Sequence, residues 1–177
     1  MASATGSLFF SGQFAISCGT ASLDVQRSKV LLIRMRKMGE YMLPKGRKDL
    51  HETLEHVALR ETFEETGIRA ELLPVAIETH ATTPSFIGAT GRPTTVTEPI
   101  AVTQRFAQGI LKIIFWYVAV ADSTAIQEEG TQQENEEFDT VWVDFDIVTS
   151  TLSFEDDRRI VQAAISAVRR GVTEVPR

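Results

Sequence analysis

Five charged side chains with fixed spacing lie in the stretch GRKDLHETLEHVALRETFEETGI, residues 46–68. They are Glu52, Arg60, Glu61, Glu64 and Glu65. We predict a helix from about Glu52 to Thr66, because a polar residue such as Thr53 can begin it and Gly67 supplies a left-handed C-terminal cap. A helix of this length would hold several carboxylates in a fixed arrangement.

The last three glutamates of this stretch fall on the same arc of the helix as Leu54, Val57 and Ala58, at about 100° per residue. An ordinary amphipathic helix keeps its carboxylates opposite its apolar stripe. Like charges at i, i+3 and i+4 repel each other, and a hard divalent cation with oxygen ligands would relieve that repulsion. The pattern therefore predicts a Mg²⁺ site, with Mn²⁺ as an alternative ion, and Arg60 can orient one carboxylate through a bidentate pair. A solvated glutamate-rich helix is the alternative reading.

This stretch resembles the Nudix box: Gly, five residues, Glu, seven residues, Arg-Glu, apolar, any, Glu-Glu, any, Gly, apolar. The matching positions are Gly46, Glu52, Arg60, Glu61, Glu64, Glu65, Gly67 and Ile68. Thr62 departs from the pattern, since the family prefers an aliphatic residue there, and we expect a small packing cost without lost chemistry. The resemblance implies an α/β fold, a Nudix-type α/β/α sandwich with a mixed central sheet. We expect a single domain over residues 1–177, with residues 1–11 as a lead-in.

The resemblance also implies roles for individual residues. The implied catalytic set is Arg60, Glu61, Glu64 and Glu65. The implied metal ligands are the Gly46 carbonyl and the side chains of Glu61, Glu64 and Glu65. Glu61 is either a ligand or the general base, since family members differ in their base, and Glu52 is an accessory residue. A further glutamate from a later loop sometimes joins the cluster, which would be Glu136 or Glu137 here.

Basic side chains flank the start of this stretch and predict a polyanionic substrate. The candidates for substrate binding are Arg34, Arg36, Lys45, Arg47, Lys48 and Arg105, with Arg92 as a further candidate in the long Thr-, Pro- and Gly-rich loop expected over residues 81–109. Ordinary surface lysines and arginines are the alternative reading. His80 is more typical of a structural polar residue than of a catalyst.

The LPKG entry followed by Arg47 and Lys48 resembles family members that hydrolyse diphosphoinositol polyphosphates and diadenosine polyphosphates. We favour an inositol pyrophosphate, because several basic residues are present and the loop holds no base-stacking pair. Trp116 and Tyr117 lie in a core-like strand, where packing is the default role. Two alternatives remain: an enzyme for diadenosine polyphosphates or other nucleoside diphosphate-linked substrates, and a non-catalytic polyanion-binding Nudix module.

Composition limits the other classes of function. With 177 residues and 43% apolar side chains the chain can bury a sizeable core. The net charge of −6 argues against a broad nucleic-acid surface, and no apolar run approaches the roughly 20 residues of a membrane helix. Cys18 is typical of a small buried apolar residue. We expect a cytoplasmic protein, because the N-terminus lacks the features of a signal peptide; a secreted protein whose signal peptide had been removed would look the same.

The remaining elements follow from hydrophobic patterning and turn residues. The predicted strands are Gln13–Thr20, Val30–Arg36, Ala70–His80, Leu111–Val120 and Asp139–Phe145. Pro44 should interrupt the chain before the glutamate helix, and residues 123–137 read as a solvated acidic loop. The last helix is predicted over Ser153–Gly171, with Ser153 and Asp156 in a capping box and an apolar stripe facing the sheet.

Overall fold

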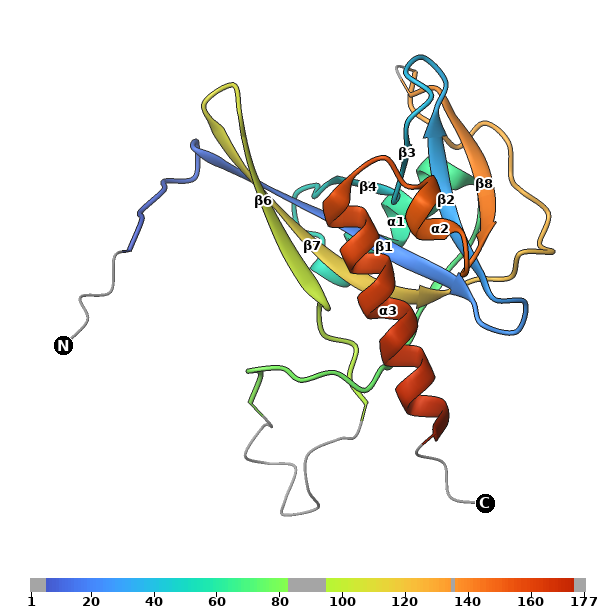
Figure 1. The fold of residues 1–177 in the computed structure, drawn as a ribbon. Helices are drawn as coiled ribbons and strands as arrows, with labels where there is room; N and C mark the ends of the chain where they lie inside the picture. The colour runs from blue at the N-terminus through green and yellow to red at the C-terminus, as the bar shows by residue number, and fades with distance from the viewer. Residues whose placement is uncertain (1–5, 83–94, 135, 174–177) are drawn as a thin grey trace.

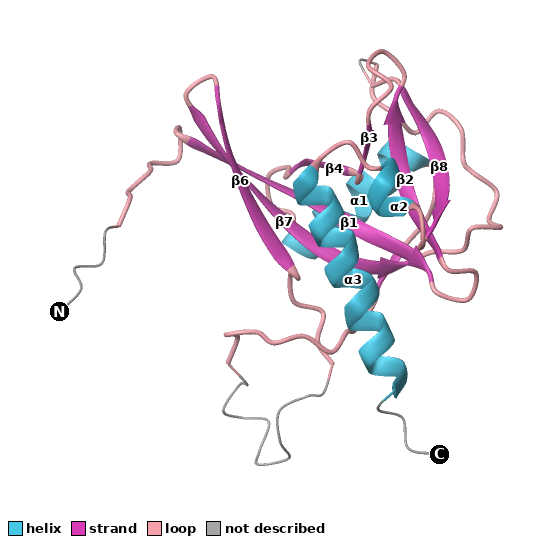
Figure 2. Ribbon diagram, in the orientation of Figure 1, coloured by secondary structure: helices cyan, strands magenta, loops and turns pink. Residues whose placement is uncertain are grey.

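The computed structural model describes residues 6–82, 95–134 and 136–173, with side chains as far as residue 170. The strands are β1 (Phe14–Asp24), β2 (Lys29–Met35), β3 (Tyr41–Met42), β4 (Lys45–Arg47), β5 (Glu71–Leu72), β6 (Ala101–Ala107), β7 (Ile110–Val120) and β8 (Phe138–Asp144). The helices are α1 (Leu54–Thr66), α2 (Val148–Thr151) and α3 (Glu155–Thr173). Helix α1 follows β1–β4 along the chain, and α2 and α3 follow β5–β8; Figure 2 distinguishes the helices from the strands by colour.

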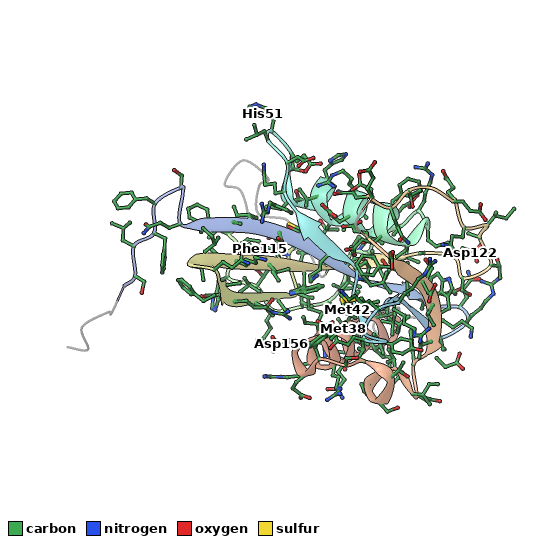
Figure 3. The ribbon with its side chains drawn as sticks, turned by 90° about the horizontal axis from the view of Figure 1, so that it is seen from above. Met38, Met42, His51, Phe115, Asp122 and Asp156 are labelled. Carbon is green, nitrogen blue, oxygen red and sulfur yellow. The ribbon has the colours of Figure 1, made fainter. Side chains whose placement is uncertain are left out.

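Within the described ranges the strands form one eight-stranded sheet with the order β3-β2-β1-β7-β5, to which β4 adds at β1, β6 at β7 and β8 at β2. β1 and β7 run parallel from the pair Phe14–Leu111 to the pair Leu23–Val120, whereas the other pairings are antiparallel. Helices α1 and α3 lie on opposite sides of this sheet (Figure 3). The α/β/α sandwich with a mixed sheet is therefore confirmed.

A hydrophobic core lies on each face of the sheet, and β1 contributes side chains to both, because successive strand side chains point to opposite faces. Cys18 packs with Val57 and Ala58 of α1, whereas Ala21 and Leu23 belong to the larger cluster that includes α3. Full burial of a large apolar side chain contributes about 1.5–3 kcal/mol. The expected burial of Cys18, Trp116 and Tyr117 is confirmed, with exposures of 0%, 0% and 2%.

Both ends of α1 follow local sequence rules. Thr53 has an extended backbone, and its hydroxyl accepts the His56 N–H at 3.3 Å. Gly67 adopts φ 69° and donates its N–H to the Phe63 carbonyl at 2.7 Å. The predicted caps are therefore confirmed, but the helix begins at Leu54, because Thr53 takes the capping position. Glu52 thus lies outside the helix, two residues before its first turn.

The prediction for residues 70–109 was wrong in two places. The expected strand Ala70–His80 is reduced to β5 and an isolated bridge between Val75 and Val96, because Pro74 lacks the N–H that a continuing ladder needs. The expected loop over residues 81–109 contains β6, which pairs antiparallel with β7. The two strands form a hairpin through the two-residue turn Gln108–Gly109, in which both residues have positive φ, a local signal that the loop-like composition of residues 81–109 obscured. In Figure 1, β6 and β7 extend beyond the helices at one end of the sheet.

The C-terminal part differs in detail from its prediction. α3 begins at Glu155, and the short helix α2 precedes it. The hydroxyl of Ser153 accepts the Tyr41 N–H at 2.9 Å, so it joins β3 to the α2–α3 turn. The apolar stripe of α3 is buried as predicted, through Ile160, Ala164, Ile165 and Val168. None of the described helices has the length and apolar character needed to span a bilayer.

Candidate active site

Strand β4 and helix α1 face each other closely at the proposed metal site. The Lys45 N–H donates to Glu65 Oε2 at 2.7 Å, which ties the strand to the helix. A Cβ built on Gly46 would overlap the Glu61 carboxylate, so this position requires the absence of a side chain. His51, at the tip of the turn before α1, points away from the molecule in Figure 3. The Lys45 hydrogen bond and the close approach of Gly46 to Glu61 therefore fix β4 against the acidic face of α1.

The guanidinium of Arg60 contacts three carboxylates at once. Its Nε and one terminal nitrogen donate to the two oxygens of Glu52, at 2.7 and 2.9 Å. The other terminal nitrogen donates to Glu61 at 2.7 Å and to Glu64 at 2.8 Å. The bidentate pair predicted for Arg60 is thus made with Glu52. One positive centre can be shared by Glu61 and Glu64.

Burial of the acidic cluster opposes its ionisation. Glu61 and Glu65 are only 4% and 3% exposed. Burial raises the pKa of Glu65 to about 8, although the Lys45 charge and N–H act in the opposite direction. Burial also raises the pKa of Glu61, against the lowering effect of Arg60. Buried carboxylates of this kind favour either protonation or a bound cation.

The donor set at this site suits a hard divalent cation. It consists of carboxylate oxygens from Glu61, Glu64 and Glu65 and the backbone carbonyl of Gly46, and Mg²⁺ and Mn²⁺ prefer such oxygen ligands. Among the described residues, no three Asp, Glu, His or Cys side chains are arranged so that they could hold a metal ion together. Arg60 occupies the position between Glu61 and Glu64 instead. The residue types fit a divalent metal ion. In this structure the Arg60 guanidinium, rather than a metal ion, pairs with the carboxylates of Glu61 and Glu64.

Glu52 supports the cluster from outside the helix. Besides Arg60, it accepts the Asp49 N–H at 2.8 Å and contacts His56 Nδ1 at 2.9 Å. The Arg60 hydrogen bond is the main reason why the pKa of Glu52 falls to about 2. Glu52 therefore stays ionised and holds Arg60 in place, in keeping with its expected accessory position.

The two late-loop candidates occupy different environments. Glu136 is half-buried, and its negative charge contributes to the raised pKa of both Glu61 and Glu65. Glu137 is exposed, and its backbone carbonyl accepts the Arg36 N–H at 3.0 Å. Of the two, Glu136 is the residue that the fold brings near the acidic cluster.

The charges of Lys45 and Arg105 both act on Asp157, a residue of α3 on the other face of the sheet. Lys45 and Gly46 are consecutive on β4, so their side-chain directions alternate. The buried carboxyl of Asp157 accepts the Leu43 N–H at 3.1 Å. Burial raises the pKa of Asp157, while that hydrogen bond and the charges of Arg105 and Lys45 oppose the rise. Lys45 therefore contacts the acidic cluster through its backbone N–H, and its charge acts on Asp157 as that of Arg105 does.

The other basic candidates are distributed unevenly. The Arg47 side chain is exposed, while its backbone carbonyl accepts from Arg60 at 3.0 Å, and Lys48 Nζ donates to the Asp49 carbonyl at 2.8 Å. Arg34 and Arg36 pair with Asp139 at 3.5 and 2.7 Å; Arg34 shares the face of β2 away from α1 with Val30 and Leu32, and Arg36 follows the end of the strand. The structure does not bring this pair to the acidic cluster, and its contact with substrate stays a prediction. Arg92 lies outside the described residues.

Sequence reasoning missed a buried hydroxyl network behind the cluster. The Thr62 hydroxyl donates to the Ala58 carbonyl at 2.8 Å and lies 2.7 Å from the Thr20 hydroxyl, which is 2.8 Å from that of Ser22. Thr62 is fully buried, so its departure from the family pattern exchanges apolar packing for hydrogen bonds rather than costing packing alone. The polar, inward-facing Thr20 and Ser22 were the available signal.

The large cavity of about 750 Å³ lies elsewhere, near the carboxyl ends of β1 and β7. Its lining includes Val25, Arg69, Leu73, Val120 and Val168, and none of the clustered glutamates. Arg69 stacks over Phe63 at 4.3 Å. The cavity is therefore separate from the candidate active site.

The chain is similar to a curated protein over part of its length. One curated relative, Nudix hydrolase 21, chloroplastic, of Arabidopsis thaliana, is 49% identical over 45 residues, which is 25% of this chain and 23% of that protein. The match thus spans about a quarter of the relative's length.

Solved structures share the fold at low identity. A NUDIX hydrolase from Nitrosomonas europaea has a TM-score of 0.58 and 12% identity, covering 87% of this chain and 90% of the other. An Ap4A hydrolase of C. elegans has a TM-score of 0.59 and 14% identity, covering 89% and 98%. The family model described as NUDIX domain matches residues 17–164, which is most of the chain. The chain therefore belongs to the Nudix family.

Proposed function

We propose that the protein hydrolyses a phosphoanhydride bond in a small, highly phosphorylated substrate with the help of a divalent metal ion, Mg²⁺ foremost. The observation that supports this proposal is the set of carboxylates on α1, two of which share one cationic nitrogen of Arg60. The third, Glu65, is buried beside them against β4. Such a set has a direct use in binding a cation that also binds phosphate.

The residues that would hold the ion are Glu61, Glu64, Glu65 and the Gly46 carbonyl. When bound, it supplies charge neutralisation at the phosphate oxygens and at the leaving phosphate. One carboxylate of the cluster accepts the proton of the attacking water, whose oxygen bonds to phosphorus as the anhydride P–O bond breaks. Glu61 is either a ligand or this base. Glu52 holds Arg60 in place through its two hydrogen bonds.

The favoured substrate class is the inositol pyrophosphates. The charge of Lys45 acts on both Glu65 and Asp157, that of Arg105 acts on Asp157, and Arg47 and Lys48 follow Lys45 in the chain. A substrate with many phosphates could contact these cations while one anhydride lies at the glutamates. Trp116 and Tyr117 are fully buried and therefore cannot stack on a nucleobase.

One observation favours a diadenosine polyphosphate as the second candidate. Arg105 lies 5.8 Å above the half-buried ring of Phe154, near Asp157. An arginine over an aromatic ring is a surface on which an adenine could stack. The C. elegans relative in fold is named an Ap4A hydrolase, which is consistent with this alternative. Phe154→Ala would separate the two, since it should weaken only the adenine-containing substrate.

The test is a panel of phosphoanhydrides with Mg²⁺, comparing a diphosphoinositol polyphosphate with diadenosine tetraphosphate. We expect faster turnover of the first, and Glu64→Gln should abolish nearly all turnover of either. Glu55→Gln is the matched control, because Glu55 is an exposed residue in the first turn of the same helix. Cleavage of neither compound would reject both substrate classes. If Glu64→Gln kept wild-type turnover, the proposed metal chemistry would be wrong.

A non-catalytic polyanion-binding module is the remaining alternative. Such a module would bind the same ligands through Lys45 and Arg47 without any need for clustered buried carboxylates. Its signature would be tight ligand binding by the wild type, unchanged in Glu64→Gln, with no product formed. Calorimetric titration of both proteins with a diphosphoinositol polyphosphate measures this directly.

A further inference from the structure

Strand β6 lies at an edge of the sheet, and among the described residues β7 is its one strand partner. The two-residue turn Gln108–Gly109 joins the two strands, and such a turn leaves its flanking residues, Ala107 and Ile110, as a hydrogen-bonded pair. Hydrogen-bonded and non-hydrogen-bonded pairs then alternate along the ladder. The Leu111 N–H agrees with this alternation, because it donates to the Gln13 carbonyl on the β1 side of β7, at 2.9 Å.

The outer edge of β6 therefore presents the backbone N–H and C=O groups of Val102, Gln104 and Phe106. None of these groups hydrogen-bonds to another described residue. An unpaired edge is a template for a further strand, and folded proteins commonly protect it with proline, a bulge or charged side chains. β6 has no proline and a continuous register with β7, and its single charge, Arg105, lies on the α3 face beside Phe154. This edge is thus open to strand pairing.

The side chains of β6 on the α1 face are apolar and exposed. Val102 lies opposite Phe115, which packs with the α1 core, and Phe106 shares this face because strand side chains alternate. Val102 is 53% exposed and Phe106 is 63% exposed. Phe106 keeps this exposure although the ring of Phe9 lies 5.9 Å from its own. Apolar side chains gathered on an open edge mark an interaction surface.

The sequence of β6 is complementary to itself in the antiparallel register centred on Gln104. A two-fold axis there pairs all seven residues of the strand with those of a second copy. Val102 then lies opposite Phe106 of the partner subunit, and Arg105 lies opposite Thr103 of the partner subunit. The pairs formed by outward-facing residues are the hydrogen-bonded ones, which gives about six hydrogen bonds between the copies. An axis at Arg105 would instead set two arginines opposite each other, which is destabilising.

We propose that the protein forms a two-fold homodimer in which the β6 edges of two copies pair antiparallel about Gln104. This pairing covers Val102 and Phe106 of each copy. It occupies both open edges, so the assembly closes at two copies. The two-fold axis is perpendicular to the joined sheet, and the Arg105 side chains of both copies therefore lie on the same face. The association does not depend on the proposed hydrolysis.

Sedimentation equilibrium of the full chain measures this association directly. We expect twice the chain mass of 19.6 kDa for the wild type, with no larger species. A monomer at every concentration up to about 100 μM, above the micromolar range of weak interfaces, would overturn the proposal. An extended peptide of another protein would then be the occupant of the edge. Open-ended larger species would also overturn it, because they require a second, different contact surface.

Gln104→Pro tests the part played by the edge backbone. The Gln104 N–H points away from β7, so proline should leave the β6–β7 ladder intact while it removes a donor at the two-fold axis. We expect a folded monomer, with the circular dichroism spectrum of the wild type, at concentrations where the wild type is a dimer. A folded variant that still dimerises as the wild type does would contradict the proposed pairing.

Two charged variants test the register itself. Val102→Lys and Phe106→Glu should each weaken self-association, because each sets a charge opposite an apolar side chain. An equal mixture of the two should regain the dimer, since the introduced ammonium faces the introduced carboxylate and one Val102–Phe106 pair remains. Ile126→Lys, at an exposed apolar residue outside β6, is the matched control and should stay dimeric. A mixture that stays monomeric would overturn the register, and this result decides the proposal if Gln104→Pro does not fold.

Discussion

Arg60 binds both carboxylate oxygens of Glu52, at 2.7 and 2.9 Å, across the point where α1 begins. The pair links a residue outside the helix to the helix surface. The remaining terminal nitrogen of Arg60 is thereby aimed at Glu61 and Glu64. Glu52 thus determines where the positive charge lies, although it is not part of the acidic cluster itself.

Replacing Arg60 by lysine tests this arrangement. Lysine keeps the charge but lacks the planar fork, so it cannot hold both oxygens of Glu52 and also reach the cluster. We expect kcat/KM to fall about 10- to 100-fold. The unfolding free energy in EDTA should fall by about 1–3 kcal/mol, the range for lost charged hydrogen bonds. Arg69→Lys, at an exposed pair with Glu128, is the control, and equal effects of the two substitutions would contradict the prediction.

The pKa of Glu65 predicts a pH-dependent stability without metal. Its folded value of about 8 lies above the unfolded value of 4.5, so the folded state binds more protons between these limits. Stability from this group is fully present below about pH 4.5 and is lost as pH rises through about 8. Glu65→Gln, which keeps an acceptor for the Lys45 N–H, should remove that slope and be the more stable protein at pH 8, by an amount on the order of a few kcal/mol at about 1.4 kcal/mol per pKa unit.

Urea denaturation in EDTA at pH 5, 6.5 and 8 measures this dependence. Glu71→Gln serves as the control, because Glu71 is exposed on β5. Parallel pH curves for the wild type and Glu65→Gln would show that the buried carboxyl does not titrate as expected.

Gly46→Ala should disable the site without a change in charge. The added methyl group would overlap the Glu61 carboxylate, so β4 or Glu61 must move. Because a displacement of about 1 Å at a reacting site can cost roughly 100-fold in rate, we expect a loss of that size in kcat/KM. Gly12→Ala is the control, since nothing lies within 4 Å of its added Cβ. Wild-type kinetics for Gly46→Ala would show that this close approach has no catalytic consequence.

Thr62→Val tests the hydroxyl network separately from catalysis. The Thr62 hydroxyl donates to the Ala58 carbonyl, so it accepts from Thr20, which in turn accepts from Ser22. Removing it leaves the buried Thr20 hydroxyl without its acceptor, which should cost about 1–3 kcal/mol of unfolding free energy. Thr62→Ser should retain more of the stability in urea titrations. If valine proved as stable as threonine, the aliphatic family preference would suit this core equally well.

The location of the acidic helix was predictable because its signals are local. The spacing of the three clustered glutamates depends only on the geometry of one helix, and the caps at Thr53 and Gly67 are properties of neighbouring residues. The strand β6 was missed although its signal is also local: the two-residue turn Gln108–Gly109, with positive φ at both residues, joins it to β7, and the Thr-, Pro- and Gly-rich composition of the preceding residues favoured a loop. The hydrogen bond from Gln132 Nε2 to the Glu65 carbonyl, at 3.1 Å, was not predictable, because it joins residues 67 positions apart and the composition of residues 123–137 gave only the expectation of a solvated loop.

The sequence by itself therefore determined the chemistry of the site: oxygen donors at fixed helical spacing, with an arginine among them and cations before them. Only the tertiary structure decided which cations and which late glutamate come close. Arg34 pairs with Asp139, 105 residues away, and faces the side of the sheet opposite α1, whereas Glu136 is brought to the cluster. The physical reason is that strand register and loop anchoring fix these positions, and both depend on contacts between distant segments.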